Sequence, residues 1–197
     1  MTVVEQASAP DESAIRGAWD GGQFERAAVL ILERYGTELL GYLHALSRPP
    51  LDADELFSAM CERLWLHLPS FRWQSSARTW TYAIARNLAR AARRSSLGPA
   101  GRVALTSDFS HVADQVRSST PAFMKTAEKS RLQEVRDALD PDDQTLLILR
   151  VDRSMSWKEI ATVIVGDDDD RTESQRAAVL RKRFERLKER LRKEMNA

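Results

Sequence analysis

Apolar side chains recur at helical spacing through most of the 197-residue chain, and this periodicity favours an all-α fold. Residues 24–46 carry one apolar stripe that ends before a pair of prolines, which disfavour a continuing helix. A second helix is predicted to begin at Asp52 or Asp54, because acids suit a helix N-terminus, and to stop near Pro69. A third is predicted over residues 78–94. Three amphipathic helices with short connections predict a compact bundle.

A change in composition divides the chain into two predicted domains. Residues 96–121 are rich in Ser, Gly and Pro and show no sustained apolar period, so we predict a flexible linker there. Residues 1–20 are predicted to be an N-terminal extension and residues 21–95 a first helical domain. Helical periodicity resumes near Ala122, which predicts a second domain over residues 122–197.

The second domain contains a candidate helix-turn-helix. Ser156 is followed three residues later by Glu159, which is the spacing of a capping box, and Gly166 suits the end of that helix. A long basic helix is predicted from Thr172 onward, with one buried stripe at Leu180, Phe184, Leu187 and Leu191.

The face opposite that stripe could read duplex DNA. Small and polar side chains near the start of such a helix reach base edges, and the later cations meet phosphates. The alternative is a charged helix that pairs with another helix, because the heptad-like spacing also fits a coiled coil. The candidate DNA-contacting residues are Gln175, Arg176, Ala178, Val179, Arg181, Lys182, Arg183 and Arg186.

Charge is distributed unevenly, although the formal net charge is only +1. Residues 1–70 have eleven Asp or Glu and five Lys or Arg, whereas eight arginines and no acid lie between Glu62 and Asp108. From Arg171 onward there are ten Lys or Arg and four Glu. Two basic blocks predict two surfaces that face polyanions. The alternative, solvated helix faces, would usually include acids as well.

Several classes of protein do not fit the sequence. The single cysteine, Cys61, cannot form an internal disulfide and lies at an apolar helix position, where a buried inert thiol is expected. The three histidines lack the spacing of metal ligands, and there is no phosphate-binding glycine loop or nucleophile elbow. No apolar run is long enough to cross a membrane, and the first residues lack the features of a signal peptide. We therefore expect a cytoplasmic protein that is not an enzyme, with no cofactor, no metal and no membrane insertion.

Four segments resemble bacterial sigma factors of the extracytoplasmic-function (ECF) group. LDADELFSAMCERLW (51–65) is similar to the region-two helix that docks on the polymerase clamp, and FRWQSSARTWTYAIARN (71–87) to the segment that melts and reads the minus-ten element. ALDPDDQTLLILRVDRSMSWKEIATVIVG and LRKRFERLKERLR resemble region four, which reads the minus-thirty-five element. The resemblance covers nearly the whole chain apart from the first twenty residues, and it implies two small helical domains.

The resemblance also implies which residues bind. Those implied to contact polymerase are Asp52, Asp54, Glu55, Leu56, Phe57 and Met60. Those implied to contact the minus-ten strand are Arg72, Trp73, Ser75, Ser76, Arg78, Thr79, Trp80, Arg86, Asn87 and Arg90.

The residue types fit this second role, because capturing single-stranded bases takes π-faces for stacking and cations for phosphates. Trp73, on the loop, is expected to be the better exposed aromatic. Trp80 is in phase with Ile84 and Leu88, so it could equally belong to the core. The polar Ser75–Ser76 pair is assigned to base holding from the resemblance alone.

Two features depart from the family pattern. Ala91 stands where the family often has an acid, so promoter contacts or packing there could differ. Asp167–Asp170 precede the predicted DNA-reading helix, where four carboxylates would repel phosphate unless they point away or cap the helix. They could instead weaken off-target binding or bind a regulator.

The resulting hypothesis is a sigma factor that directs core RNA polymerase to specific promoters and has no catalysis of its own. Its expected partners are the polymerase clamp and flap, promoter DNA and an anti-sigma protein, the last from the resemblance only. Two alternatives remain: a dimeric helix-turn-helix repressor, and a helical module that occupies polymerase without initiating transcription.

Overall fold

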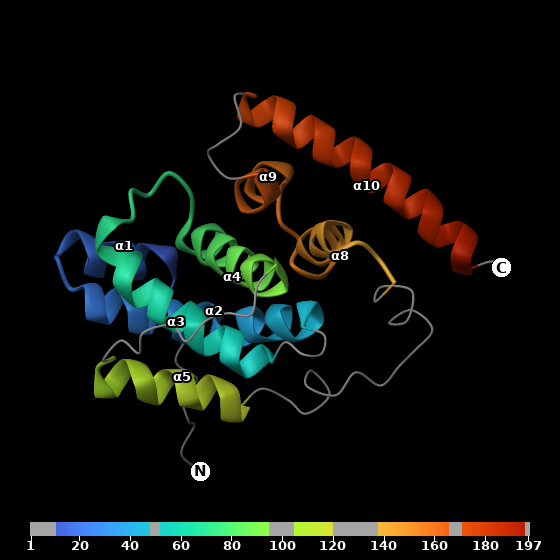
Figure 1. Cartoon of the computed structure of the whole chain (residues 1–197). Coiled ribbons are helices and arrows are strands. Elements are labelled where there is room, and N and C mark those ends of the chain that lie inside the picture. The colour runs from blue at the N-terminus through green and yellow to red at the C-terminus, as the bar shows by residue number, and fades with distance from the viewer. Residues whose placement is uncertain (1–10, 48–51, 95–104, 120–137, 166–170, 196–197) are drawn as a thin grey trace, which may run out of the picture.

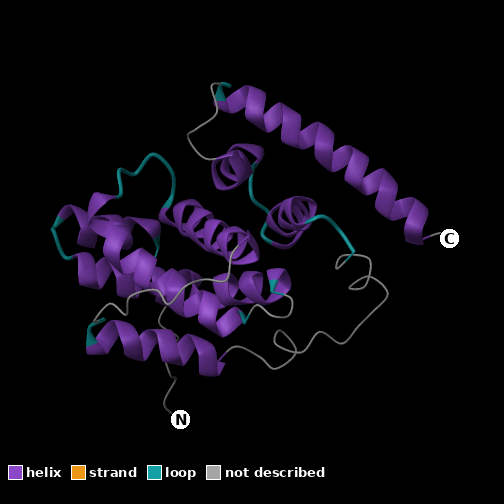
Figure 2. Cartoon of the chain, viewed as in Figure 1, coloured by secondary structure: helices purple, strands orange, loops and turns teal. Residues whose placement is uncertain are grey.

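The computed structural model describes residues 11–47, 52–94, 105–119, 138–165 and 171–195, and in these the fold is all-α, as predicted. Figure 2 shows helices joined by loops, with no strand in the described ranges. The elements are α1 (Glu12–Asp20), α2 (Phe24–Leu46), α3 (Ala53–His67), the 3-10 turn η1 (Leu68–Ser70), α4 (Ala77–Arg94), α5 (Ser107–Ser119), α8 (Pro141–Leu147), the π-helix η2 (Ile148–Asp152), α9 (Trp157–Val165) and α10 (Glu173–Met195).

Side-chain caps fix where three of these helices begin. The Asp52 carboxylate accepts hydrogen bonds from the amides of Asp54 and Glu55, at 2.7 and 3.3 Å, and so starts α3 where the sequence predicts it. Ser156 and Glu159 form the predicted capping box of α9, with reciprocal bonds of 2.8 and 3.3 Å. Helix α10 begins with a similar pair, Thr172 and Gln175. The side chain of Gln175 therefore holds the start of the helix, although the sequence suggested a DNA contact.

The N-terminal half, which we define as α1–α5, is built around α2. This helix buries residues on most of its circumference, because α1, α3, α4 and α5 all pack against it (Figure 1). Tyr42 on α2 and Tyr82 on α4 are fully buried with ring centroids 5.1 Å apart. The core thus fixes α4 relative to α2, which matters because α4 carries most of the candidate minus-ten residues.

Part of the predicted linker is a packed helix. Phe109, Ala113 and Val116 form the buried stripe of α5, at helical spacing. Val116 packs so closely on Gly36 of α2 that a Cβ at residue 36 would lie 2.7 Å from Val116 Cγ2. The prediction of irregular structure is therefore wrong for 107–119. Only three apolar positions repeat in this segment, among Ser and other polar residues, and so few repeats do not reveal a helical period. The rest of 96–121 lies outside the described residues, apart from residues 105 and 106.

The predicted N-terminal extension also contains a packed helix. Ile15 of α1 is fully buried, and the Trp19 ring packs edge-on to Phe24 at 6.0 Å. Residues 12–20 therefore belong to the N-terminal half, and residues 1–10 lie outside the described ranges.

The C-terminal half, which we define as α8–α10, packs a long helix across two short ones (Figure 1). Leu180, Phe184 and Leu187 face inward as predicted, and Trp157 of α9 packs against Phe184 at 5.5 Å. Three features of the sequence lie outside the described residues: the helix predicted to begin near Ala122, Gly166, and the acidic run Asp167–Asp170. The two halves are in contact through α4 with α9 and through α2 with α8, so the division into two domains stays a prediction.

Cys61 is buried as expected, and burial raises the pKa of its thiol to about 12. None of the described helices combines the length and the apolar character that a membrane crossing requires.

Candidate nucleic-acid interface

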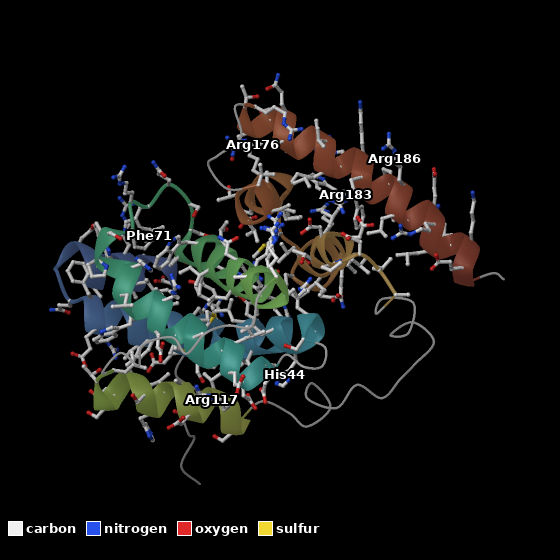
Figure 3. All side chains as sticks on the ribbon, viewed as in Figure 1. His44, Phe71, Arg117, Arg176, Arg183 and Arg186 are labelled. Carbon is white, nitrogen blue, oxygen red and sulfur yellow. The ribbon has the colours of Figure 1, made fainter. Side chains whose placement is uncertain are left out.

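A cavity of about 820 Å³ lies beside the loop that joins η1 to α4. The rings of Phe71 and Trp80 stack at its wall, 4.5 Å apart and 20° from parallel. Figure 3 labels Phe71 at this loop and Arg176 at the start of α10. The lining residues are His67, Ser70, Phe71, Arg72, Gln74, Ser75, Trp80, Ala83, Thr162, Glu173 and Arg176. Stacked rings next to arginines and amide or hydroxyl groups can hold a base and its phosphate.

Of the two tryptophans near this cavity, Trp80 and not Trp73 lines it. Trp73 is half-buried: its ring packs on Trp19 at 6.1 Å and on Phe71 at 4.9 Å, and it is not among the lining residues. Trp80 is half-buried as well, so the prediction that Trp73 is the better exposed of the two stays a prediction. The Trp73 ring is covered in part by Trp19 of α1, a helix that the sequence did not predict.

One face of α4 remains open to solvent. Asn87 and Arg90 are exposed along it, and Arg72 is exposed on the preceding loop, so three predicted contacts are available to a ligand. Gln74 at the cavity and Arg94 on α4 are also exposed, and neither is among the contacts predicted from the sequence. Arg94 could have been found, because it lies four residues after Arg90 and so on the same face of the helix.

Other positions of α4 are covered by other parts of the chain. Thr79 is fully buried, and Ser76 Oγ accepts a hydrogen bond from its amide at 3.0 Å, which is the geometry of an N-cap. Arg78 forms a bidentate pair with Glu38 at 2.7 and 2.9 Å, and this bond raises the pKa of the Arg78 guanidinium above its usual range. The prediction that Thr79 contacts DNA is therefore corrected, because its side chain is fully buried. Ser76 and Arg78 have structural partners but are partly exposed, so their DNA contacts stay predictions.

Arg86 is likewise corrected, because it lies where the two halves meet. Its side chain is 5 % exposed, and Nη2 donates to the Asp142 carboxylate at 2.7 Å. Beside this pair, Gln144 Nε2 donates to the carbonyl of Ala45 at 2.8 Å. A buried guanidinium needs a charged partner, and Asp142, far away in sequence, supplies it here.

The Arg86–Asp142 pair can be tested by unfolding. We expect Asp142→Asn to lower the free energy of unfolding by about 1.5–3 kcal/mol, because the buried guanidinium loses its charge-assisted bond. The measurement is urea unfolding followed by circular dichroism. Glu185→Gln is the matched control, because it removes one charge from an exposed pair with Lys188 and should cost at most about 1 kcal/mol. Equal losses in the two variants would contradict a buried pair.

Helix α10 presents a second cationic face. Arg181, Lys182 and Arg186 are exposed, as are Ala178 and Val179 (Figure 3 labels Arg186). Arg183 instead points toward α8, where its Nε donates to Asp143 at 2.6 Å, and Arg176 Nε donates to the carbonyl of Arg171 at 2.8 Å. The exposed members of the predicted minus-thirty-five set are therefore Gln175, Ala178, Val179, Arg181, Lys182 and Arg186.

The predicted polymerase-binding residues at the start of α3 also include both exposed and buried side chains. Asp52 and Glu55 are exposed and Asp54 is half-buried. Leu56, Phe57 and Met60 are at most 1 % exposed, because they form the core against neighbouring helices. The prediction that these three apolar side chains contact polymerase directly is corrected: they hold α3 in place.

Part of the chain matches the model of a known protein family. Residues 31–96 match the family model of sigma-70 region 2. The matched segment includes α3, the 71–76 loop and α4. Neither the curated proteins nor the solved structures gave a match.

Proposed function

We propose that the chain is a sigma factor of the ECF type, which binds core RNA polymerase through α3 and captures the opened minus-ten strand with the 71–76 loop and α4. Helix α10 then acts as a region-four element on upstream duplex DNA. The observation that carries the proposal is the cavity at the 71–76 loop, because stacked Phe71 and Trp80 beside Arg72 lie within the segment that matches region 2.

The cavity suits a single-stranded base better than duplex DNA. A base must leave the stack to reach an aromatic wall inside a cavity, and an opened promoter offers such bases. Gln74 and Ser75 supply donors and acceptors at the same wall. Arg90 and Arg94 extend the cationic surface along α4.

The experiment is run-off transcription with purified core RNA polymerase and a pool of randomised templates. We expect transcripts that start downstream of two recurring sequence elements at a fixed spacing, and none with core enzyme alone. A repressor would neither bind core enzyme nor give product, and a non-initiating module would bind core enzyme without product. Either outcome would contradict the proposal. An anti-sigma partner stays a prediction.

The role of α10 can be tested through salt dependence. Replacing Arg181, Lys182 and Arg186 by Ala should weaken binding to upstream duplex and reduce the slope of log K against log salt by about three units, roughly one for each phosphate that the protein no longer neutralises. Fluorescence anisotropy of a labelled duplex measures this slope. Arg26→Ala, an exposed cation on α2, is the control and should leave the slope unchanged. If the triple variant keeps the wild-type slope, the duplex interface lies elsewhere.

A further inference from the structure

Helix α1 contacts the 71–76 loop and its flanks at three points. Trp19 Nε1 donates to the carbonyl of Leu68 at 2.8 Å, just before the loop. The guanidinium of Arg16 lies 5.3 Å from the centre of the Trp73 ring, in the middle of the loop. Glu12 Oε1 accepts a hydrogen bond from the amide of Ala77, where α4 begins. The loop that supplies much of the cavity wall is thus fixed at both ends and at its centre by one helix.

Glu12 supplies charge that α4 lacks. The first turn of α4 contains no acid, and the first amides of any helix have no partner within it. A carboxylate at this position pairs one of these amides and complements the helix dipole. The other oxygen of Glu12 accepts from the hydroxyl of Tyr35 at 2.6 Å, so the carboxylate is held between α2 and α4. Burial, together with this bond, raises the pKa of the Tyr35 hydroxyl above its usual range, which keeps it a donor.

Trp73 shows why the loop needs such support. Its φ is 54°, in the left-handed region that bulky residues rarely adopt. A backbone of this kind persists only where the surroundings hold it. Here Arg16 and Trp19 cover the ring from α1, while Phe71 packs on it from within the loop.

We infer that α1 is a positioning element, in which Glu12 and Trp19 hold the 71–76 loop in the shape that captures a single-stranded base. The inference rests on the proposed function, and it assigns a role to residues outside the matched segment 31–96. Neither residue lines the cavity, so neither needs to touch DNA. A loop that is already ordered does not lose further conformational freedom when the base binds, and affinity for the base is higher for that reason.

The test uses the full chain assembled with core enzyme. Glu12→Ala should lower affinity for a short non-template strand, taken from the minus-ten element found by run-off selection, by about tenfold. Glu12→Gln should restore most of this affinity, because the amide oxygen can still accept from Ala77. Trp19→Phe keeps a ring but loses the bond to Leu68, and should give a smaller loss. Affinity for core enzyme should change less than about twofold in all three.

The control is Glu25→Ala, which removes the same charge from the first turn of α2, where the side chain is exposed. It should leave strand affinity unchanged. Unchanged strand affinity in Glu12→Ala would overturn the inference. An equal loss of affinity for core enzyme and for the strand would also overturn it, because such a loss indicates that the variant has lost structure generally.

Amide hydrogen exchange of the free protein separates the inference from the proposed function. Glu12→Ala should increase exchange across residues 71–77 while leaving α3 and α9 protected, whether or not DNA is bound. The wild-type protein could give no promoter-directed transcript while exchange across residues 71–77 still rises in Glu12→Ala. The proposed function would then be wrong, but the conclusion that α1 orders the 71–76 loop would stand. Unchanged exchange in Glu12→Ala overturns the inference even if the wild type initiates transcription.

Discussion

Replacing Glu55 with Arg should prevent the chain from co-purifying with core RNA polymerase while leaving it folded. Glu55 is exposed in the first turn of α3, within residues 1–70, where acids outnumber bases, so it is available to a basic partner surface. At a protein interface the reversal would place like charges together, which costs several kcal/mol. In the isolated protein it replaces a favourable charge at the helix N-terminus by an unfavourable one, and each of these two changes is worth about 0.3–1 kcal/mol at an exposed site.

The control for this variant is Glu33→Arg, which makes the same change of charge at an exposed position of α2. Both variants should keep the wild-type helical circular dichroism and thermal midpoint to within several degrees, which corresponds to about 2 kcal/mol or less. Pull-down with tagged core enzyme then measures binding. Normal co-purification of Glu55→Arg would remove α3 as the polymerase dock, and an equal loss in Glu33→Arg would indicate a non-specific charge effect.

The second large effect is expected for Trp80→Ala, which should reduce promoter opening by roughly 5- to 150-fold. Loss of one base stack on an aromatic ring costs about 1–3 kcal/mol, and the stack forms only once bases are exposed. Trp80 is half-buried with one ring face on Phe71, so the variant also loses some packing. Trp80→Phe keeps an aromatic face and should recover much of the activity.

Permanganate reactivity of unpaired thymines measures opening, and a gel shift on ice measures the closed complex. Opening should fall far more than closed-complex binding in Trp80→Ala. Trp73→Ala serves as a comparison. The Trp73 ring packs on Trp19 of α1, so its loss should lower the thermal midpoint as well as promoter opening. Equal losses of both complexes in Trp80→Ala would show that Trp80 acts in folding or in duplex contact.

What the sequence predicted correctly was local in origin. The Asp52 cap and the Ser156–Glu159 capping box follow from residues within one turn, and the apolar stripe of α10 follows from a long regular period. Helices α2 and α4 were predicted with nearly their observed ends for the same reason.

What the sequence did not predict depends on distant contacts. Arg86 is neutralised by Asp142, which lies 56 positions away, and no local pattern relates the two. Trp73 packs on Trp19 of α1, a contact that no local pattern indicates, and Trp80 rather than Trp73 lines the cavity. Leu56, Phe57 and Met60 occupied the core in place of the predicted dock, since apolar side chains on an amphipathic helix face inward by default.

The enclosed and the exposed positions of α4 carry different constraints on variation. Thr79 and Arg86 are enclosed by the rest of the chain, so a substitution there disturbs packing or leaves a partner charge unpaired. Asn87, Arg90 and Arg94 face solvent on the same helix, and surface changes of this kind cost little stability. On the proposed function, selection for a different promoter can therefore act on these exposed positions without endangering the fold. Related chains that serve different promoters should differ at the exposed positions and keep the enclosed ones.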